Sequence, residues 1–241
     1  LQVYYGKKGI KTVLQGKTNT LLYAKVQQTV GGIPSESTTE TVEEPDYYIG
    51  ADESGKGDYF GPLVTASVFT TPQIRKTLQK VGIRDSKQIS DSTIMDYYRQ
   101  IVQTPGLTFS YRVVIPSVYN PLYQSCPNLN LLLTKLHLET ILDQMNKSNC
   151  KVVLLDQYGN AEKTAREAKS IAGLKLIQTT NAERFTGVAA ASVVARKHFL
   201  EWIQNFGQRI GQPVPKGAGT EADEFAKWIF RKYGQEVLSK M

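Results

Sequence analysis

The sequence predicts an α/β protein in which helices cover a mixed β-sheet, with a smaller α+β segment ahead of it. Two observations support this fold class. Two strand-like stretches first follow one another around a glycine-rich loop, which is the order of an antiparallel pair. Further along, short apolar strands alternate with helical patterns, which is the order of parallel strands joined by helices. A chain of 241 residues can hold one sizeable core with a small appended module.

The first thirty residues predict part of a small N-terminal domain. The stretch LQVYYGKKGIKTVLQG has the pattern of a β-hairpin that turns at residues 7–9, and NTLLYAKVQQTV has that of a short helix capped by Asn19. About thirty residues bury too little surface for a stable core of their own. We therefore interpret residues 1–30 as the end of a truncated domain.

Residues 31–46 predict a linker. Their sequence, GGIPSESTTETVEEPD, is rich in Gly, Pro, Ser, Thr and Glu and has almost no large apolar side chain to bury. The sign of the charge also changes here. The first thirty residues carry five lysines and no acid, whereas these sixteen carry five acids and no base.

The main region, residues 47–241, carries the elements of the predicted sheet and its helices. Strands are expected at 47–54, 63–70, 107–115, 151–156 and 174–179. Helices are expected at 72–80, 90–103, 128–146, 161–172, 187–206 and 221–234. The strand KVVLLD is apolar up to its final Asp, as expected for a strand buried on both faces.

The composition narrows the class of protein. Lys and Arg number 29 against 22 Asp and Glu, and the net charge of +7 favours a polyanionic partner, although ordinary solubility charge would look the same. No run of about 18 apolar residues predicts a membrane span, and the first residues lack the apolar core of a signal peptide. Cys126 and Cys150 are too few for a disulfide framework, so a cytoplasmic location is expected.

The stretch IGADESGKGDYFGP, residues 49–62, admits two interpretations. The spacing from Gly50 to Lys56 nearly matches a phosphate-binding P-loop, but Gly57 stands where a P-loop needs Ser or Thr. A P-loop also joins a strand to a helix, whereas this loop joins two predicted strands. Two carboxylates within the loop would moreover repel phosphate. The sequence therefore favours a metal site over a P-loop.

Asp52 and Glu53 are the adjacent carboxylates of this loop. In a regular strand they would point to opposite faces, but a strand end released by glycines can bring both toward one hard cation. Mg²⁺ prefers a few carboxylates together with waters and phosphate oxygens. An isolated Asp-Glu pair is more often a solvated turn. The Gly55, Lys56 and Gly57 that follow favour the metal site, because their backbone can approach a sugar-phosphate chain.

Two further acids follow later strands. Asp156 ends the strand KVVLLD, and open α/β sheets place their sites beyond the carboxyl ends of such strands. The alternative for Asp156 is a turn-forming residue. If the two strands are neighbours, Asp52 and Asp156 lie side by side. Glu183, after the next strand, is the candidate fourth carboxylate, and its alternative is a surface loop acid.

Other catalytic chemistries fit less well. The sequence has no G-x-S-x-G nucleophile elbow. His137 and His198 fall on separate predicted helices, and we expect each at a helix surface. Ser192 and Arg196 belong to the small-residue helix GVAAASVVAR and are interpreted as structural, although the helix end could carry Arg196 and Lys197 toward a phosphate.

Five motifs occur in order along the chain: GADESGKGDYFGPLV, RDSKQIS, LLDQYG, VAAASVVARKHF and PKGAG. Together they resemble the type 2 ribonucleases H, and DYFGP and PKGAG are most similar to ribonuclease HIII. The resemblance covers residues 47–241 and implies an RNase H-like catalytic domain. It also implies that residues 1–30 are the remnant of a domain like the TATA-box-binding protein, which helps to hold the substrate.

The resemblance implies hydrolysis of the RNA strand of RNA/DNA hybrids with divalent metal. Carried over residue by residue, it assigns catalysis and metal binding to Asp52, Glu53, Asp156 and Glu183. It assigns substrate binding to Gly55, Lys56 and Gly57, which read 2′-hydroxyls, to Ser86 and Lys87, which contact phosphate, and to Lys7, Lys8 and Lys11 of the N-terminal remnant.

Two Mg²⁺ or Mn²⁺ ions about 4 Å apart would activate water and stabilise the leaving oxygen, giving 5′-phosphate and 3′-hydroxyl ends. The expected protein is a monomer that binds an RNA/DNA hybrid. One alternative is a ribonuclease HII-like enzyme that cuts at single ribonucleotides, and the other is a hybrid-binding protein without catalysis. The stretch QPVPKGAGTEADEF has no aromatic ring before Phe225. Its lack of the Tyr associated with HII favours HIII.

Overall fold

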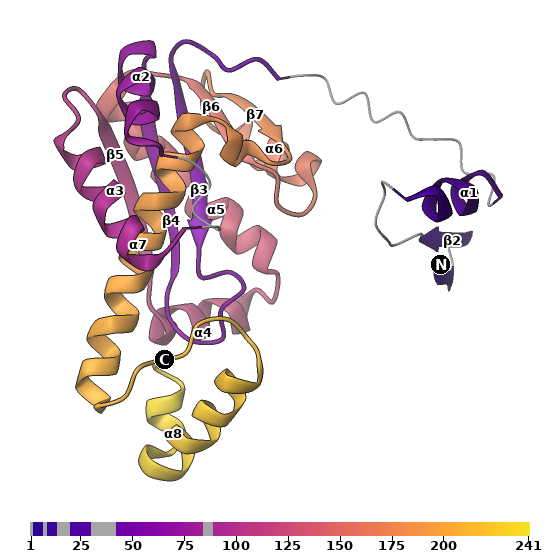
Figure 1. The fold of residues 1–241 in the computed structure, drawn as a ribbon, viewed down its shortest axis with the longest axis vertical. Helices are drawn as coiled ribbons and strands as arrows, with labels where there is room; N and C mark the ends of the chain where they lie inside the picture. Colours follow the sequence, from indigo (N-terminus) through magenta and orange to yellow (C-terminus); the bar gives the residue numbers. More distant parts are fainter. Residues whose placement is uncertain (1, 7–8, 14–19, 30–41, 84–88) are drawn as a thin grey trace. The chain divides into compact units, whose positions relative to one another are not determined.

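The computed structural model describes residues 2–6, 9–13, 20–29, 42–83 and 89–241. The chain divides into two compact units, Leu1–Glu43 and Glu44–Met241 (Figure 1). In the first unit, β1 (Gln2–Gly6) and β2 (Gly9–Val13) pair antiparallel and α1 (Leu21–Thr29) follows, which confirms the predicted hairpin and helix. The predicted cap Asn19 lies outside the described residues. Thr20 Oγ1 accepts the Tyr23 N–H at 3.3 Å, as an N-cap does.

The second unit is built on one mixed sheet of five strands, in the order β5-β4-β3-β6-β7 (Figure 1). The strands are β3 (Tyr48–Ser54), β4 (Leu63–Thr70), β5 (Thr108–Val114), β6 (Val152–Asp156) and β7 (Lys175–Thr179). β3, β4 and β5 pair antiparallel, whereas β3, β6 and β7 pair parallel. The predicted mixed sheet is confirmed.

The helices of this unit are α2 (Pro72–Val81), α3 (Asp91–Gln103), α4 (Pro116–Ser125), α5 (Leu129–Ser148), α6 (Ala161–Ala168), the 3₁₀ turn η2 (Ala182–Arg184), α7 (Thr186–Ile210) and α8 (Thr220–Leu238). The side chains of Thr71, Ser90 and Asn128 each accept a first-turn N–H and so cap α2, α3 and α5. The sequence did not predict α4. Pro116 suits its first turn, but Pro121 inside it works against a helical interpretation.

The sheet is covered on both faces because its side chains alternate. Val64, Ala66 and Val68 of β4 belong to the core shared with α2, α3 and α7. Thr65 and Ser67 point the other way, where their hydroxyls donate to the Leu136 and Thr140 carbonyls of α5 at 3.3 and 2.8 Å. Hydrogen bonds as well as packing therefore hold α5 against the sheet.

Helix α7 lies unusually close to β3 because two glycines face each other. A Cβ built on Gly50 would lie 2.2 Å from the Gly187 carbonyl carbon, closer than any side chain can approach. The Tyr48 hydroxyl accepts the Gly187 N–H at 2.8 Å and so satisfies one of the free donors at the start of α7. This contact fixes the position of α7 relative to the carboxyl end of β3.

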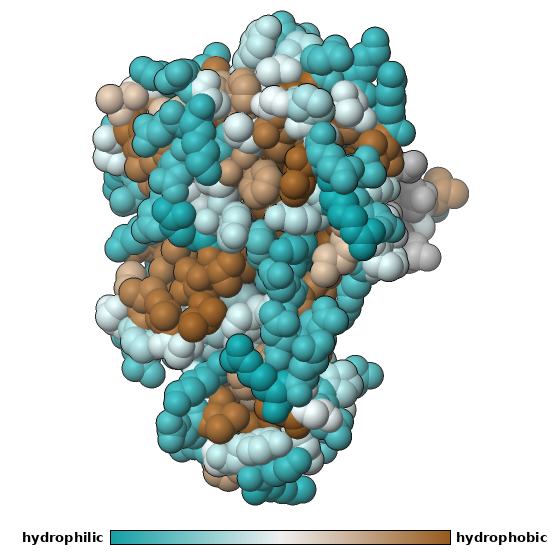
Figure 2. Space-filling model, turned by 90° about the vertical axis from the view of Figure 1, so that its left-hand side faces the viewer, coloured by the Kyte–Doolittle hydropathy of each residue, from teal (hydrophilic) through white to brown (hydrophobic). Residues whose placement is uncertain are grey.

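Apolar side chains left at the surface gather in separate patches on an otherwise largely hydrophilic face (Figure 2). In the described parts of the chain, no helix is both long enough and apolar enough to cross a bilayer. The longest, α7, has 25 residues, several of them charged. The sequence-based expectation of no membrane span is consistent with this finding.

Candidate active site

The carboxyl ends of β3 and β6 bring two acids together. Ala51 pairs with Leu155 in the parallel register, so the next residues, Asp52 near the end of β3 and Asp156 at the end of β6, lie side by side at the carboxyl ends of the two strands. The expectation that these two acids lie side by side is confirmed. Both line a cavity of about 460 Å³. The cavity is also lined by Glu53, Ser54, Gly55, Lys56, Gly57, Ile89, Gln157, Tyr158, Ser192 and Arg196.

The side chains of Asp52 and Glu53 point to opposite faces of the sheet, as in any regular strand, although both line this cavity. Asp52 is buried, 6 % exposed, on the face covered by α7, where it accepts a hydrogen bond from Ser192. Glu53 points to the face covered by α5, where its Oε2 lies 3.1 Å from His137 Nε2. Its Oε1 lies 3.5 Å from Lys56 Nζ. The pair therefore reaches the cavity from its two walls, and the strand end does not unwind to bring them together.

The pKa values of these two acids move in opposite directions. Burial, followed by repulsion from Glu53, raises the pKa of Asp52 to about 8. Burial alone would also raise the pKa of Glu53, but the hydrogen bond from His137, assisted by Lys56, holds it below its usual value. Asp52 therefore binds a proton readily at neutral pH, and Glu53 remains ionised.

Asp156 and Glu183 are connected through the backbone. Asp156 Oδ1 accepts the N–H of Ala182 at 2.8 Å, which ties the end of β6 to η2. Glu183, the next residue in η2, lines a different cavity together with Gln79 and Arg184. The structure therefore brings three of the four predicted acids into one cavity and leaves Glu183 beside it.

The two glycines of the Gly-Lys-Gly segment have different surroundings. Gly55 has a φ of +94°, and a Cβ there would lie 2.1 Å from the Pro62 carbonyl oxygen, so the fold itself requires glycine. A Cβ at Gly57 would meet no described atom within 4 Å. Only Gly57 leaves open space on the side where a substrate backbone could approach.

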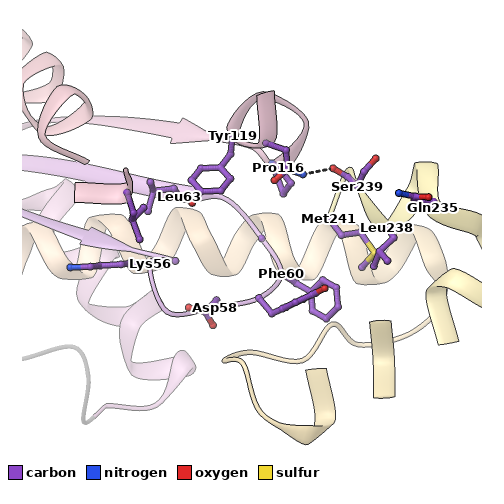
Figure 3. Close-up of a pocket in the computed structure, with 15 residues that line it drawn as sticks. Lys56, Asp58, Phe60, Leu63, Pro116, Tyr119, Gln235, Leu238, Ser239 and Met241 are labelled. Carbon is purple, nitrogen blue, oxygen red and sulfur yellow. Dashed lines mark hydrogen bonds between the residues drawn. The ribbon is translucent and has the colours of Figure 1, made fainter. Parts of the chain in front are cut away.

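A second cavity, of about 400 Å³, adjoins the same segment. Its walls come from the β3–β4 loop, α4 and the end of α8, and in Figure 3 Lys56 extends away from Leu238 and Met241. The Gly61 N–H donates to the Met241 carbonyl at 2.8 Å, which holds the loop against the end of α8. Lys56 therefore stands between the two cavities.

The DYFGP and PKGAG motifs meet in space. The Gly217 N–H donates to Asp58 Oδ1 at 2.6 Å, and the Tyr59 N–H donates to the Gly217 carbonyl at 3.0 Å. Two motifs far apart in the sequence thus form one loop cluster next to the acids.

Comparison with known proteins agrees with this geometry. The sequence model of the Ribonuclease HII family matches residues 49–241. The chain belongs to this family, the type 2 ribonucleases H. Ribonuclease HIII of Protochlamydia amoebophila is 38% identical over 194 residues, which are 79% of this chain and 63% of the relative. Ribonuclease HIII of Chlamydia muridarum is 36% identical over 253 residues, 95% of this chain and 83% of the relative.

A solved type 2 ribonuclease H, Bst-RNase HIII in complex with Mn²⁺, superposes with a TM-score of 0.74 at 26% identity. The match covers 94% of this chain and 77% of that one. It confirms the RNase H-like fold of the second unit. The chain spans about 63% of the length of the first relative named above, so it represents part of that protein's length.

The divalent metal of the type 2 ribonucleases H fits the chemistry of these donors. Burial, followed by repulsion from Glu53 and Asp156, raises the pKa of Asp52, and a cation between these acids would relieve the repulsion. In the described residues, no three His, Cys, Asp or Glu side chains already stand in metal-binding geometry. The contacts above explain this, because Glu53 is turned toward His137 and Asp156 toward Ala182.

Both histidines correct the sequence analysis, which expected them at helix surfaces. His137 is fully buried and His198 is 8 % exposed. His198 stacks on Tyr111 with ring centroids 3.7 Å apart, and burial followed by the charge of Lys197 lowers its pKa to about 4. Helical periodicity alone could not indicate that His137 faces an acid, because that contact is 84 residues away in the sequence.

Two more residues reach the acid cavity. The sequence analysis interpreted both as structural, although it allowed that the helix end could carry Arg196 toward a phosphate. Ser192 binds Asp52, and Arg196 lines the acid cavity, where its guanidinium lies 4.9 Å from the Phe199 ring centroid and 3.8 Å from Asp91. The predicted phosphate contacts Ser86 and Lys87 lie outside the described residues. So do Lys7 and Lys8, while Lys11 is described only as backbone in β2.

Proposed function

We propose that this chain is an endonuclease that hydrolyses the RNA strand of RNA/DNA hybrids, as ribonuclease HIII does. The observation that carries the proposal is the meeting of Asp52 and Asp156 at the ends of paired parallel strands, beside an open Gly57 backbone. Membership of the type 2 family and the ribonuclease HIII relatives support it.

Asp52, Glu53 and Asp156 would hold divalent ions, either Mg²⁺ or Mn²⁺, and Glu183 would complete the set from η2. The Mn²⁺ in the related Bst-RNase HIII structure supports this choice of metal. Bound ions would supply an activated water and charge stabilisation at the leaving oxygen, which gives 5′-phosphate and 3′-hydroxyl products. The role of Ser192 is to keep the buried Asp52 oriented through their hydrogen bond.

The chain's own groups would orient the substrate. The backbone of residues 55–57 faces the acid cavity and is suited to reading 2′-hydroxyls, the groups that distinguish RNA from DNA. Lys56 and Arg196 line the same cavity and would contact phosphates, as would Ser86 and Lys87. Such contacts should make binding weaken as salt concentration rises.

The N-terminal unit would add affinity. Its hairpin and helix fit the end of a domain like the TATA-box-binding protein, and Lys7, Lys8 and Lys11 would contact the hybrid. The domain limits proposed from the sequence, 1–30, 31–46 and 47–241, belong to the same proposal. So do a monomeric state and a cytoplasmic location.

A ribonuclease HII-like junction enzyme is the second candidate, since the matching family model carries that description. The surroundings of Phe225 disfavour it, because this ring packs edge-on against buried Phe60, with ring centroids 5.3 Å apart. We therefore expect rapid cutting within four or more ribonucleotides and slow cutting at a single one. Equal rates on the two duplexes would favour the HII-like activity.

The proposal is tested by turnover on an RNA/DNA hybrid with and without Mg²⁺. Metal-dependent cutting of the RNA strand alone is expected. Tight hybrid binding without any cutting, in either Mg²⁺ or Mn²⁺, would contradict the proposal and indicate a binding protein without catalysis.

A further inference from the structure

His137 is the most deeply buried ionisable side chain that touches an acid of the site. Its side chain is 1 % exposed, and its Nε2 lies 3.1 Å from Glu53 Oε2. A carboxylate accepts hydrogen bonds and cannot donate them, so Nε2 must carry the proton in this contact. Among the described residues Nδ1 has no hydrogen-bond partner, which suits a bare lone pair better than a buried N–H. The geometry therefore assigns the Nε2–H tautomer.

The ring of His137 is held rigidly. It stacks on Tyr158, with ring centroids 5.2 Å apart and planes inclined by 19°. The Tyr158 hydroxyl in turn donates to Thr134 Oγ1 of the same helix at 3.3 Å. The hydrogen bonds from β4 reach the carbonyls of Leu136 and Thr140, on either side of His137 along α5. The donor is thus anchored to the sheet that carries Glu53.

The two oxygens of Glu53 have partners of different strength. Oε2 faces the buried His137, whereas Oε1 faces Lys56, whose side chain is 36 % exposed and 3.5 Å away. An ion pair of that length with a partly exposed lysine is weak and exchanges readily with other partners. Oε2 is therefore held in place, and Oε1 is the oxygen that can leave Lys56 for a cation in the cavity.

We propose that His137 is a positioning residue that fixes the Glu53 carboxylate so that Oε1 is presented to a divalent ion. The inference rests on the proposed function only in taking Glu53 as a metal ligand. Groups that hydrogen-bond to metal ligands commonly change metal affinity by about 10–100-fold when they are removed. This role would make His137 a determinant of metal affinity, with no direct contact with the substrate.

The test is Mn²⁺ binding, followed by the electron paramagnetic resonance signal of the free ion, in the absence of nucleic acid. His137→Phe keeps an aromatic ring against Tyr158 but removes the donor, and we expect the Kd for Mn²⁺ to rise about 10-fold. His137→Gln keeps an N–H donor and should lose less affinity. His198→Phe is the matched control, a second buried histidine that contacts none of the four acids, and should leave the Kd unchanged.

Two results of the Mn²⁺ measurement on the histidine variants would overturn the inference. One is an unchanged Mn²⁺ affinity in a His137→Phe protein that unfolds at the wild-type temperature. The other is an equal loss of affinity in His198→Phe, which would indicate a general packing effect. If His137→Phe does not fold, ¹⁵N NMR of the wild-type ring decides the matter. The Nε2–H tautomer is expected, and an Nδ1–H tautomer would refute the contact on which the inference depends.

Hydrolysis is measured separately, so that this inference and the proposed function can fail independently. In a hybrid-cutting assay, His137→Phe should raise the Mg²⁺ concentration for half-maximal rate about 10-fold, while kcat at saturating Mg²⁺ stays within about twofold of wild type. Wild-type protein that binds Mn²⁺ but never cuts a hybrid would contradict the proposed function and leave the role of His137 standing. Glu53→Gln with unchanged Mn²⁺ affinity would refute the role of His137.

Discussion

Two acid-bearing regions lie next to each other in this protein and differ in how they are built. The first is the cavity at the ends of β3 and β6, where Asp52, Glu53 and Asp156 come from strands paired in a fixed register. The second is η2, a single 3₁₀ turn whose Glu183 lines a neighbouring cavity. A hydrogen bond from the Ala182 N–H to Asp156 Oδ1 connects them.

The difference shows what a sheet contributes to a site. Backbone pairing holds the acids of the first region in place although Asp52 is buried and lies beside Glu53, and burial, followed by repulsion from Glu53, raises the pKa of Asp52. A short turn has no such support, so the position of Glu183 depends on the local contacts of η2. We expect the first region to be rigid, with repulsion between its acids until a cation binds. We expect the backbone of η2 to move when Glu183 takes part in binding that cation.

The largest expected effect is the loss of hydrolysis in Asp52→Asn and in Asp156→Asn. The amide keeps the shape of the side chain but removes the charge that would hold metal. Metal ions contribute several kcal/mol to such reactions, so each change should slow hybrid cutting by about 10³-fold or more. Asp143→Asn, at an exposed acid paired with Arg112, is the control. Near-normal turnover in either site variant would remove the first region from catalysis.

Glu183→Gln measures the contribution of the second region. Because Glu183 lines a separate cavity and would reach the ions only by an adjustment of η2, we expect a smaller loss, roughly 10–100-fold. Steady-state rates at several Mg²⁺ concentrations would measure it, with the exposed Glu236→Gln as control. Wild-type rates would mean that another residue completes the site.

The electrostatic cost of the first region can be measured without substrate. Asp52 has a folded-state pKa of about 8, above its ordinary value of 3.8, so its contribution to stability is complete below about pH 4 and is lost as the pH rises through 8. In EDTA, Asp52→Asn should therefore unfold at a higher temperature than wild type at pH 8 to 9. Each kcal/mol gained should raise Tm by about 2–4 °C.

The pH and Mg²⁺ dependence of the same thermal scans tests whether the gain in stability of Asp52→Asn is electrostatic. The advantage of Asp52→Asn should shrink toward pH 4, where the wild-type carboxyl is protonated, and saturating Mg²⁺ should reduce it at high pH by stabilising the wild type alone. An advantage that does not depend on pH would show that repulsion between these acids is not its cause.

The smallest effect is expected outside both regions. Replacing Lys7, Lys8 and Lys11 together with Ala should raise KM for the hybrid a few-fold and flatten its salt dependence, with kcat little changed. The reason is that these residues would contribute phosphate contacts and take no part in the chemistry. An unchanged KM across a salt titration would mean that the N-terminal unit does not bind the hybrid.

The sequence predicted the parts of this molecule that depend on local pattern. The strand KVVLLD ends at its acid, and the parallel pairing of β6 with β3 placed Asp156 beside Asp52 as expected. Helix α4 was missed because Pro121 lowers the helical tendency of a segment that tertiary contacts nevertheless support, such as the bond from Asn120 to the Ser239 carbonyl.

What the sequence could not predict depends on contacts between distant residues. The direction in which a helical side chain points is set by what covers the helix, so His137 and His198 were assigned to surfaces. Likewise, no spacing indicates that Glu183 would line a cavity of its own, because a 3₁₀ turn has no register with the sheet. The catalytic roles of the four acids remain predictions.

The contact between Gly50 and Gly187 has a consequence for genetics. Neither residue touches an acid, but a methyl group at Gly50 would push α7 away from β3 and carry Ser192 away from Asp52. Alleles such as Gly50→Ala should therefore fold at low temperature and fail at higher temperature. A screen for conditional mutants would recover this glycine pair, although neither glycine would take part in the reaction.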